Sequence, residues 1–171
     1  MQQVPVIRDE KPADIDAIRE VTVAAFAPLK ISNKTEHLII EGLRLAGALA
    51  ISLVAEREGR IVGHLALSPV TLSDGTPGWF GLGPVSVLPD CERQGIGTAL
   101  IEEGLARLRA KGARGCCLVG HPEYYRRFGF EHPPDLAHAG VPPEFHFTLS
   151  FDGHVPRGTV GFHEAFMAAG G

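Results

Sequence analysis

Residues 78–89, GWFGLGPVSVLP, form a strand-like segment that cannot keep a hydrogen-bonded neighbour on both sides along its whole length. Its aliphatic and aromatic residues favour a β-strand, but Gly83 and Pro84 lie in the middle of it. Because proline has no backbone N–H to donate, the strand must bulge or lose a partner at this point. A sheet that contains the segment is therefore interrupted near its centre.

A glycine-rich turn follows this strand closely and precedes a helix. The segment PDCERQGIGTALIEEGLARL, residues 89–108, places Gly95 and Gly97 directly before an apolar pattern of helical period. The start of a helix leaves several N–H groups without partners and carries a partial positive charge. Because the glycines remove side chains and Arg93 adds a positive charge, the turn is suited to a phosphate or pyrophosphate. The alternative is a flexible turn that binds no ligand.

Two common phosphate-binding loops do not fit this turn. A Walker A loop requires a lysine after its glycines, and GIGTAL has none. The dinucleotide fingerprint requires a third small residue where this chain has Leu100, and it normally opens a βαβ unit. A dinucleotide-dependent oxidoreductase is therefore disfavoured.

The order of the predicted elements indicates an α/β (α+β) protein with a mixed sheet and helices on both faces. Strands are predicted at residues 4–8, 49–56, 60–72, 78–89, 115–120 and 143–151, with a hairpin turn at 57–60. Helices are predicted at 13–26, at 32–49 with capping-box spacing from Asn33 to Glu36, from near Gln94 to Lys111, and within 121–130. Residues 1–171 are predicted to be a single domain with a core at about 4–151 and a tail at 152–171.

The last predicted strand alternates apolar and polar residues. The apolar set is Phe145, Phe147, Leu149 and Phe151, and the polar set is His146, Thr148 and Ser150. This period of two predicts a half-buried strand with one face toward the core.

Composition and charge narrow the classes of partner. The net charge of −4 disfavours general binding to nucleic acid or to a membrane surface, and no apolar run is long enough to cross a bilayer. The three cysteines, Cys91, Cys116 and Cys117, lack the spacing of a zinc site and are expected to be small buried residues. We therefore expect no metal, no nucleic acid and no membrane partner, and a reducing, cytoplasmic location with no secretory signal.

The glycine turn resembles that of the GNAT superfamily of acetyl-CoA-dependent N-acetyltransferases. The family motif is Gln/Arg-x-x-Gly-x-Gly/Ala, and Gly95 and Gly97 occupy its two small positions. Glu92 stands at the first motif position, which is a departure from the family pattern. Further along, YYRRFGF is similar to the family's Tyr-x-x-x-Gly-Phe, with Tyr125 at the tyrosine position. The resemblance covers roughly residues 4–151, and the tail resembles a small bacterial branch of predicted acetyltransferases.

This resemblance implies a largely antiparallel sheet whose central strands, 84–87 and 116–119, splay apart to hold the pantetheine arm of acetyl-CoA. The main chain of the first strand would bind that arm as an added strand would, and the amides of the glycine turn would hold the pyrophosphate. The implied coenzyme-binding residues are Val85, Val87, Arg93, Gln94, Gly95, Ile96, Gly97, Thr98 and Phe128.

The resemblance also implies acyl transfer, which needs an acid for the departing thiolate and a route for the proton of the amine. Tyr125 is the predicted acid because it occupies the family's tyrosine position, and Tyr124 is its rival. His121 is the candidate base or relay, and the alternative is a turn histidine without a chemical role. His64 is expected to be a strand histidine with a satisfied partner, and Glu123 a surface residue.

The predicted function is transfer of an acetyl group from acetyl-CoA to a small-molecule or protein amine, by a monomer or a homodimer. A non-catalytic module that binds or senses acyl-CoA with the same fold is the alternative. The sequence leaves the acceptor amine and the general base open.

Overall fold

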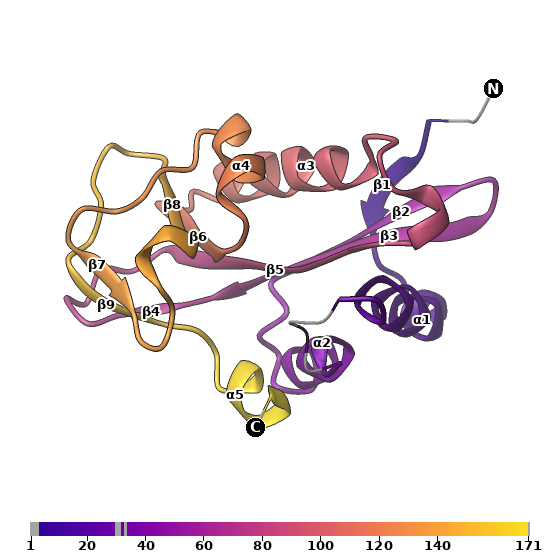
Figure 1. The fold of residues 1–171 in the computed structure, drawn as a ribbon, viewed down its shortest axis with the longest axis horizontal. Coiled ribbons are helices and arrows are strands. Elements are labelled where there is room, and N and C mark those ends of the chain that lie inside the picture. Colours follow the sequence, from indigo (N-terminus) through magenta and orange to yellow (C-terminus); the bar gives the residue numbers. More distant parts are fainter. Residues whose placement is uncertain (1–3, 30–31, 33, 171) are drawn as a thin grey trace.

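A computed structural model describes residues 4–29, 32 and 34–170, and it places a six-stranded sheet at the centre of the molecule (Figure 1). The strand order is β1-β2-β3-β5-β6-β8. These strands are β1 (Val6–Asp9), β2 (Ile51–Arg57), β3 (Arg60–Pro69), β5 (Trp79–Val87), β6 (Gly115–Val119) and β8 (His146–Ser150). Within this sheet, as the described residues form it, only the β5–β6 pair is parallel. The predicted mixed, largely antiparallel sheet is therefore confirmed.

The hairpin between β2 and β3 follows directly from its sequence. Arg57 pairs with Arg60, so the loop consists of Glu58 and Gly59 alone, with φ of 55° and 76°. Two successive positive φ angles give the turn that matches the twist of antiparallel strands, and glycine adopts such angles without strain. The predicted hairpin is confirmed.

Helices cover both faces of the sheet, as predicted. In Figure 1, α3 (Ile96–Ala110) and α4 (Pro122–Tyr125) lie on one face, and α1 (Ile15–Phe26), α2 (Glu36–Leu45) and α5 (Ala165–Gly170) lie on the other. An apolar stripe of α3 is buried against β2 and β3; it comprises Ile96, Leu100, Ile101, Leu105 and Leu108. Thr35 precedes the first turn of α2, and the predicted capping residue Asn33 lies outside the described residues.

The β5–β6 ladder ends where Gly83 and Pro84 predicted an interruption. β5 pairs with β6 only from Trp79 to Gly81, while Val85 to Val87 pair with β3 alone. The register between β3 and β5 also shifts opposite Pro84. At this point β5 therefore pairs irregularly with β3 on one side and no longer pairs with β6 on the other. The second half of β5 keeps one unpaired edge.

A second sheet lies at one end of the molecule and was not predicted. Its strand order is β4-β9-β7, and the strands are β4 (Thr71–Leu72), β9 (Gly158–Gly161) and β7 (Leu136–His138). β9 and α5 belong to the segment that the sequence indicated only as a tail at 152–171. The structure gives this segment a packed role, because β9 is the central strand and Ala165 and Phe166 of α5 pack against α2.

The second sheet also explains why β8 is not half-buried. His146 and Thr148 were expected to face solvent, yet they are only 2% and 4% exposed. Phe147 joins the core under α3, whereas His146 faces His138 of β7. Both faces of this strand are covered, so the prediction of one solvent-facing side is wrong.

Candidate functional site

A hollow of about 440 Å³ lies over the glycine turn. Gly95 precedes α3 with a φ of 83°, in the left-handed region that favours glycine, and Arg93 has a φ of 63°. Six of the residues predicted to bind coenzyme line this hollow, namely Val87, Arg93, Gly95, Ile96, Gly97 and Thr98. The predicted turn therefore opens onto a space large enough for a phosphate group.

The glycines and the charges of this hollow both suit an anion. A Cβ on Gly97 would lie 3.4 Å from the Tyr124 hydroxyl and 3.7 Å from Cγ2 of Val87, so a larger side chain would project into the hollow. Among the described residues that line it, Arg93 and Arg127 are basic and Glu92 is acidic. The first N–H groups of α3 lack intrahelical partners, and the start of this helix borders the same hollow as the two arginines.

Gln94 and Phe128 lie beside this hollow rather than in its lining. The Gln94 side-chain oxygen accepts a hydrogen bond from Arg57 at 2.5 Å. Phe128 lines a neighbouring hollow of about 500 Å³ along α3, together with Arg109 and Arg127. Because Arg127 lines both spaces, the two hollows adjoin each other.

The two adjacent tyrosines point in different directions. The Tyr124 hydroxyl lies 3.2 Å from Oγ1 of Thr98, and Arg127 stacks over the Tyr124 ring, so this side chain belongs to the glycine turn. The Tyr125 ring lies against Gly120, where a Cβ would come within 2.3 Å of its edge, and it packs edge-on against Phe130. Burial, together with neighbouring Tyr124, raises the pKa of Tyr125 to about 12. The Tyr125 phenol therefore carries its proton at neutral pH.

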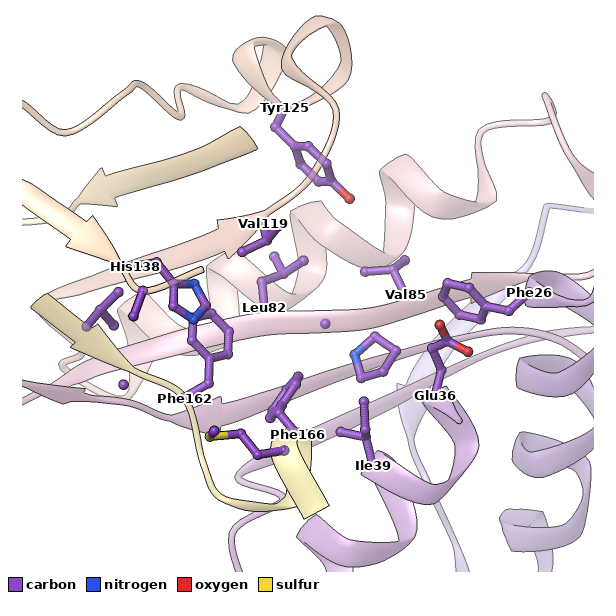
Figure 2. Close-up of a pocket in the computed structure, with 16 residues that line it drawn as sticks. Phe26, Glu36, Ile39, Leu82, Val85, Val119, Tyr125, His138, Phe162 and Phe166 are labelled. Atoms are coloured by element: carbon purple, nitrogen blue, oxygen red, sulfur yellow. The ribbon is translucent and has the colours of Figure 1, made fainter. Parts of the chain in front are cut away.

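A larger cavity of about 510 Å³ opens where β5 and β6 separate, and the Tyr125 hydroxyl points into it (Figure 2). The parted strands contribute Leu82, Gly83, Pro84, Val85 and Val119. The helices contribute Phe26, Glu36, Ile39, Phe166 and Met167, and the second sheet with its flanking residues contributes His138, Ala139, Val160, Gly161 and Phe162. Tyr125 and Val85, predicted separately from sequence, are thus brought to one cavity.

Two polar side chains of this cavity were missed by sequence reasoning. Oε2 of Glu36 accepts a hydrogen bond from the Ser32 hydroxyl at 2.6 Å, and the His138 ring stacks on Phe162 with centroids 4.8 Å apart. Burial lowers the pKa of His138, so the ring is neutral at pH 7. Glu36 was interpreted only as a helix-capping residue, and His138 lies between two predicted elements, at 121–130 and 143–151, in a segment to which no role was assigned. No local signal could have found them, because both reach the cavity through tertiary packing.

Two predicted histidines lie outside the cavity lining. His121 is exposed at the start of α4, where its Nδ1 accepts the Glu123 N–H at 3.3 Å. His64 is fully buried, its Nε2 lies 2.7 Å from the Ser52 hydroxyl, and desolvation lowers its pKa to about 4. The expectation of a strand histidine with a partner is confirmed at Nε2 of His64, whereas its buried Nδ1 has no hydrogen-bond partner among the described residues. The candidate base His121 stays a prediction.

The cysteines are buried and free, as expected. Cys116 faces the core under α3 and Cys117 faces the second sheet, as neighbouring residues of a strand do. Within the described residues, no group of three or more histidine, cysteine, aspartate or glutamate side chains is placed to hold a metal ion. In the same part of the chain, no helix combines the length and the apolar character that crossing a bilayer requires.

Comparison with known proteins agrees with this architecture. Residues 6–132 match the family described as "Acetyltransferase (GNAT) domain". The uncharacterized N-acetyltransferase YhbS of Escherichia coli K12 is 33% identical over 127 residues, which span 74% of this chain and 73% of that protein. YjhQ of the same organism, also named an uncharacterized N-acetyltransferase, is 32% identical over 135 residues, 78% of this chain and 72% of its own.

Solved structures give the same result at the level of the fold. A GNAT family acetyltransferase from Brucella melitensis, in complex with acetyl-CoA, is 49% identical with a TM-score of 0.85, covering 95% of this chain and 97% of that one. Escherichia coli YhbS in complex with CoA is 29% identical with a TM-score of 0.87, covering 96% and 92%. The family match, these relatives and the parted β5–β6 pair agree, and the chain belongs to the GNAT family of acetyltransferases.

Proposed function

We propose that this protein transfers an acetyl group from acetyl-CoA directly to a primary amine. The observation that carries the proposal is the continuity of three features: the glycine-turn hollow, the unpaired edge of β5, and the cavity that holds the Tyr125 hydroxyl. Val87 lines the first space and Val85 the last, so one strand edge joins them. Two structural relatives hold acetyl-CoA or CoA, which supports assigning this path to the coenzyme.

The coenzyme is proposed to lie along this path with its pyrophosphate at the glycine turn. The amides of residues 94–98 and the guanidinium groups of Arg93 and Arg127 would hold the phosphates. The pantetheine arm would then add to the free edge of β5 at Val85 and Val87. Phe128, on the adjoining hollow, would contact the remaining part of the coenzyme.

The chemistry proposed for the cavity is a single displacement at the thioester. A primary amine that has lost its ammonium proton attacks the carbonyl carbon, a C–N bond forms, and the C–S bond breaks with its electron pair going to sulfur. Tyr125 donates a proton to the departing thiolate and regains one from the newly acylated nitrogen. Counted from the ammonium form of the amine, the net products are the amide, CoA thiol and the one proton that the ammonium group lost before the attack. Because His121 is exposed and lies outside the cavity lining, we propose that this proton passes to solvent.

Release of CoA thiol in the presence of amines tests the proposal. A thiol-reactive chromophore should report release from acetyl-CoA that depends on both the protein and an added amine, and mass spectrometry should find the acetylated amine. Calorimetric binding of acetyl-CoA without release for any primary amine would instead support the non-catalytic acyl-CoA module. Absence of acetyl-CoA binding would contradict both.

A further inference from the structure

We propose that the 510 Å³ cavity binds a primary amine with a single positive charge on an apolar, ring-sized body, and that Glu36 binds the ammonium end. The inference rests on the proposed function, because it takes this cavity to be the acceptor site. It adds the chemical class of the acceptor and the residue that selects it.

The lining of the cavity is apolar and aromatic. Phe26, Phe162 and Phe166 present rings to it, and Ile39 and Leu82 add aliphatic wall. Pockets of roughly 300–1,000 Å³ with such walls bury most of the surface of a small apolar ligand. The volume of about 510 Å³ has room for the acetyl end of the coenzyme together with an acceptor of one ring.

The charge distribution selects a cation with only one charge. Among the described residues that line the cavity, Glu36 is the only carboxylate, and none is a lysine or arginine. In the part of the chain that the structure describes, no basic side chain forms an ion pair with Glu36; its carboxylate is held by the Ser32 hydroxyl. A second ammonium group or a carboxylate on the acceptor would be buried against aromatic rings without a counter-charge, which is costly.

The Tyr125 hydroxyl and the Glu36 carboxylate lie at the same end of the cavity. Figure 2 shows the Tyr125 hydroxyl and the Glu36 carboxylate pointing toward the Val85 end, while His138, Phe162 and Phe166 lie toward the other end. An amine held by Glu36 would therefore have its nitrogen beside the free edge of β5, where the thioester is proposed to lie. The apolar body would extend toward the two phenylalanines.

The apolar end comes from a part of the chain beyond the matched family domain. The match ends at residue 132, and Phe162 and Phe166 belong to β9's flank and to α5. Phe162 stacks on His138, which is neutral because burial lowers its pKa, so this end offers no charge at pH 7. The residues that would contact the body of the acceptor thus come from a different part of the chain than those proposed to hold the coenzyme.

Calorimetry with matched probes tests the inference without depending on turnover. 2-Phenylethylamine, 2-phenylethanol, phenylalanine and spermidine would each be titrated into the free protein and into its CoA complex. We expect 2-phenylethylamine to bind tightest. The alcohol lacks the cation, phenylalanine adds a carboxylate, and spermidine adds charges without a ring. Tighter binding of spermidine or phenylalanine, or equal binding of the alcohol, would overturn the inference.

Variants of α2 locate the cation site. Glu36→Gln should weaken 2-phenylethylamine binding about tenfold or more, because the amide oxygen can still accept a hydrogen bond but the negative charge that strengthens it is lost. The variant should also raise the KM of this amine more than it lowers kcat. Glu41→Gln is the matched control, since Glu41 pairs with Arg19 outside the cavity lining on the same helix. Equal effects of the two variants would remove Glu36 from the site.

The outcomes also separate the inference from the proposed function. CoA and 2-phenylethylamine could both bind without thiol release, which would leave the inference standing and contradict catalysis. Acetylation of spermidine with no use of 2-phenylethylamine would support the proposed function and refute the acceptor class.

Discussion

Replacing Tyr125 by phenylalanine removes one hydroxyl from the cavity and leaves its surroundings in place. The ring would keep its edge-on contact with Phe130, at a centroid distance of 6.3 Å, and its position against Gly120. We therefore expect the variant to fold and to bind acetyl-CoA with nearly the affinity of the parent. What it loses is the proton that the phenol would donate to the departing sulfur.

The magnitude follows from the role assigned to that proton. General acid catalysis by a positioned side chain is worth about 10²–10⁴-fold, so Tyr125→Phe should lower kcat by about 10²-fold or more. A pKa of about 12 keeps the phenol protonated throughout the range in which activity would be measured. The pH dependence of the parent should therefore rise toward the pKa of the acceptor amine and show no separate loss from this tyrosine below pH 10.

Tyr124→Phe is the matched control, and it should change the KM for acetyl-CoA and not kcat. Its hydroxyl lies 3.2 Å from Thr98 at the glycine turn, so its loss should raise the KM for acetyl-CoA by about tenfold at most and leave kcat close to the parent value. Steady-state kinetics with a working acceptor measures both. If Tyr125→Phe turned over like the parent, the phenol would be only a wall of the cavity. If Tyr124→Phe lost kcat instead, the family motif would be shifted by one residue.

Three further results are expected. Gly97→Val should weaken acetyl-CoA binding measured by calorimetry while the fold survives, because its side chain would enter the hollow between Tyr124 and Val87; unchanged affinity would exclude the phosphate assignment. CoA at a hundred times its dissociation constant should raise the free energy of unfolding by about 2.7 kcal/mol, and NAD should have no effect. Stabilisation by NAD with none by CoA would favour a dinucleotide enzyme. The free energy of unfolding should fall as the pH drops from about 6.5 toward 4, since burial lowers the pKa of His64 and His146 to about 4 and the unfolded chain binds those protons first. Denaturant titrations that give one stability across this range would contradict that linkage.

Several features of the fold were predictable because their causes are adjacent in the sequence. Glu58 and Gly59 specify a two-residue turn, and Gly83 with Pro84 breaks a strand wherever that strand is placed. Gly95 and Gly97 mark the start of α3, since Gly95 directly precedes the helix and Gly97 lies in its first turn. In each case a short segment carries the whole physical reason, so no knowledge of distant contacts was needed.

The second sheet was not predictable for the opposite reason. β4 has two residues and β7 three, which is too short for a period of two to be visible. β7 and β9 pair in parallel, although β8 of the other sheet lies between them in the sequence. Neither segment therefore indicates its partner. His146 was assigned to solvent because its own strand alternates, and only the presence of β7 over that face changes its surroundings.

The same distinction divides the candidate site into two halves. The proposed coenzyme path uses main-chain groups of one strand and one turn. Where a main chain lacks hydrogen-bonded neighbours, glycine and proline are often found, and these residues can be recognised in the sequence. The proposed acceptor cavity uses side chains from α1, α2, the second sheet and α5, which are distant in sequence and meet only by packing. Glu36 illustrates the difference, since the same residue that favours the start of α2 also supplies the cavity's carboxylate. Chains that share the glycine turn can therefore differ in acceptor through residues that no local motif records.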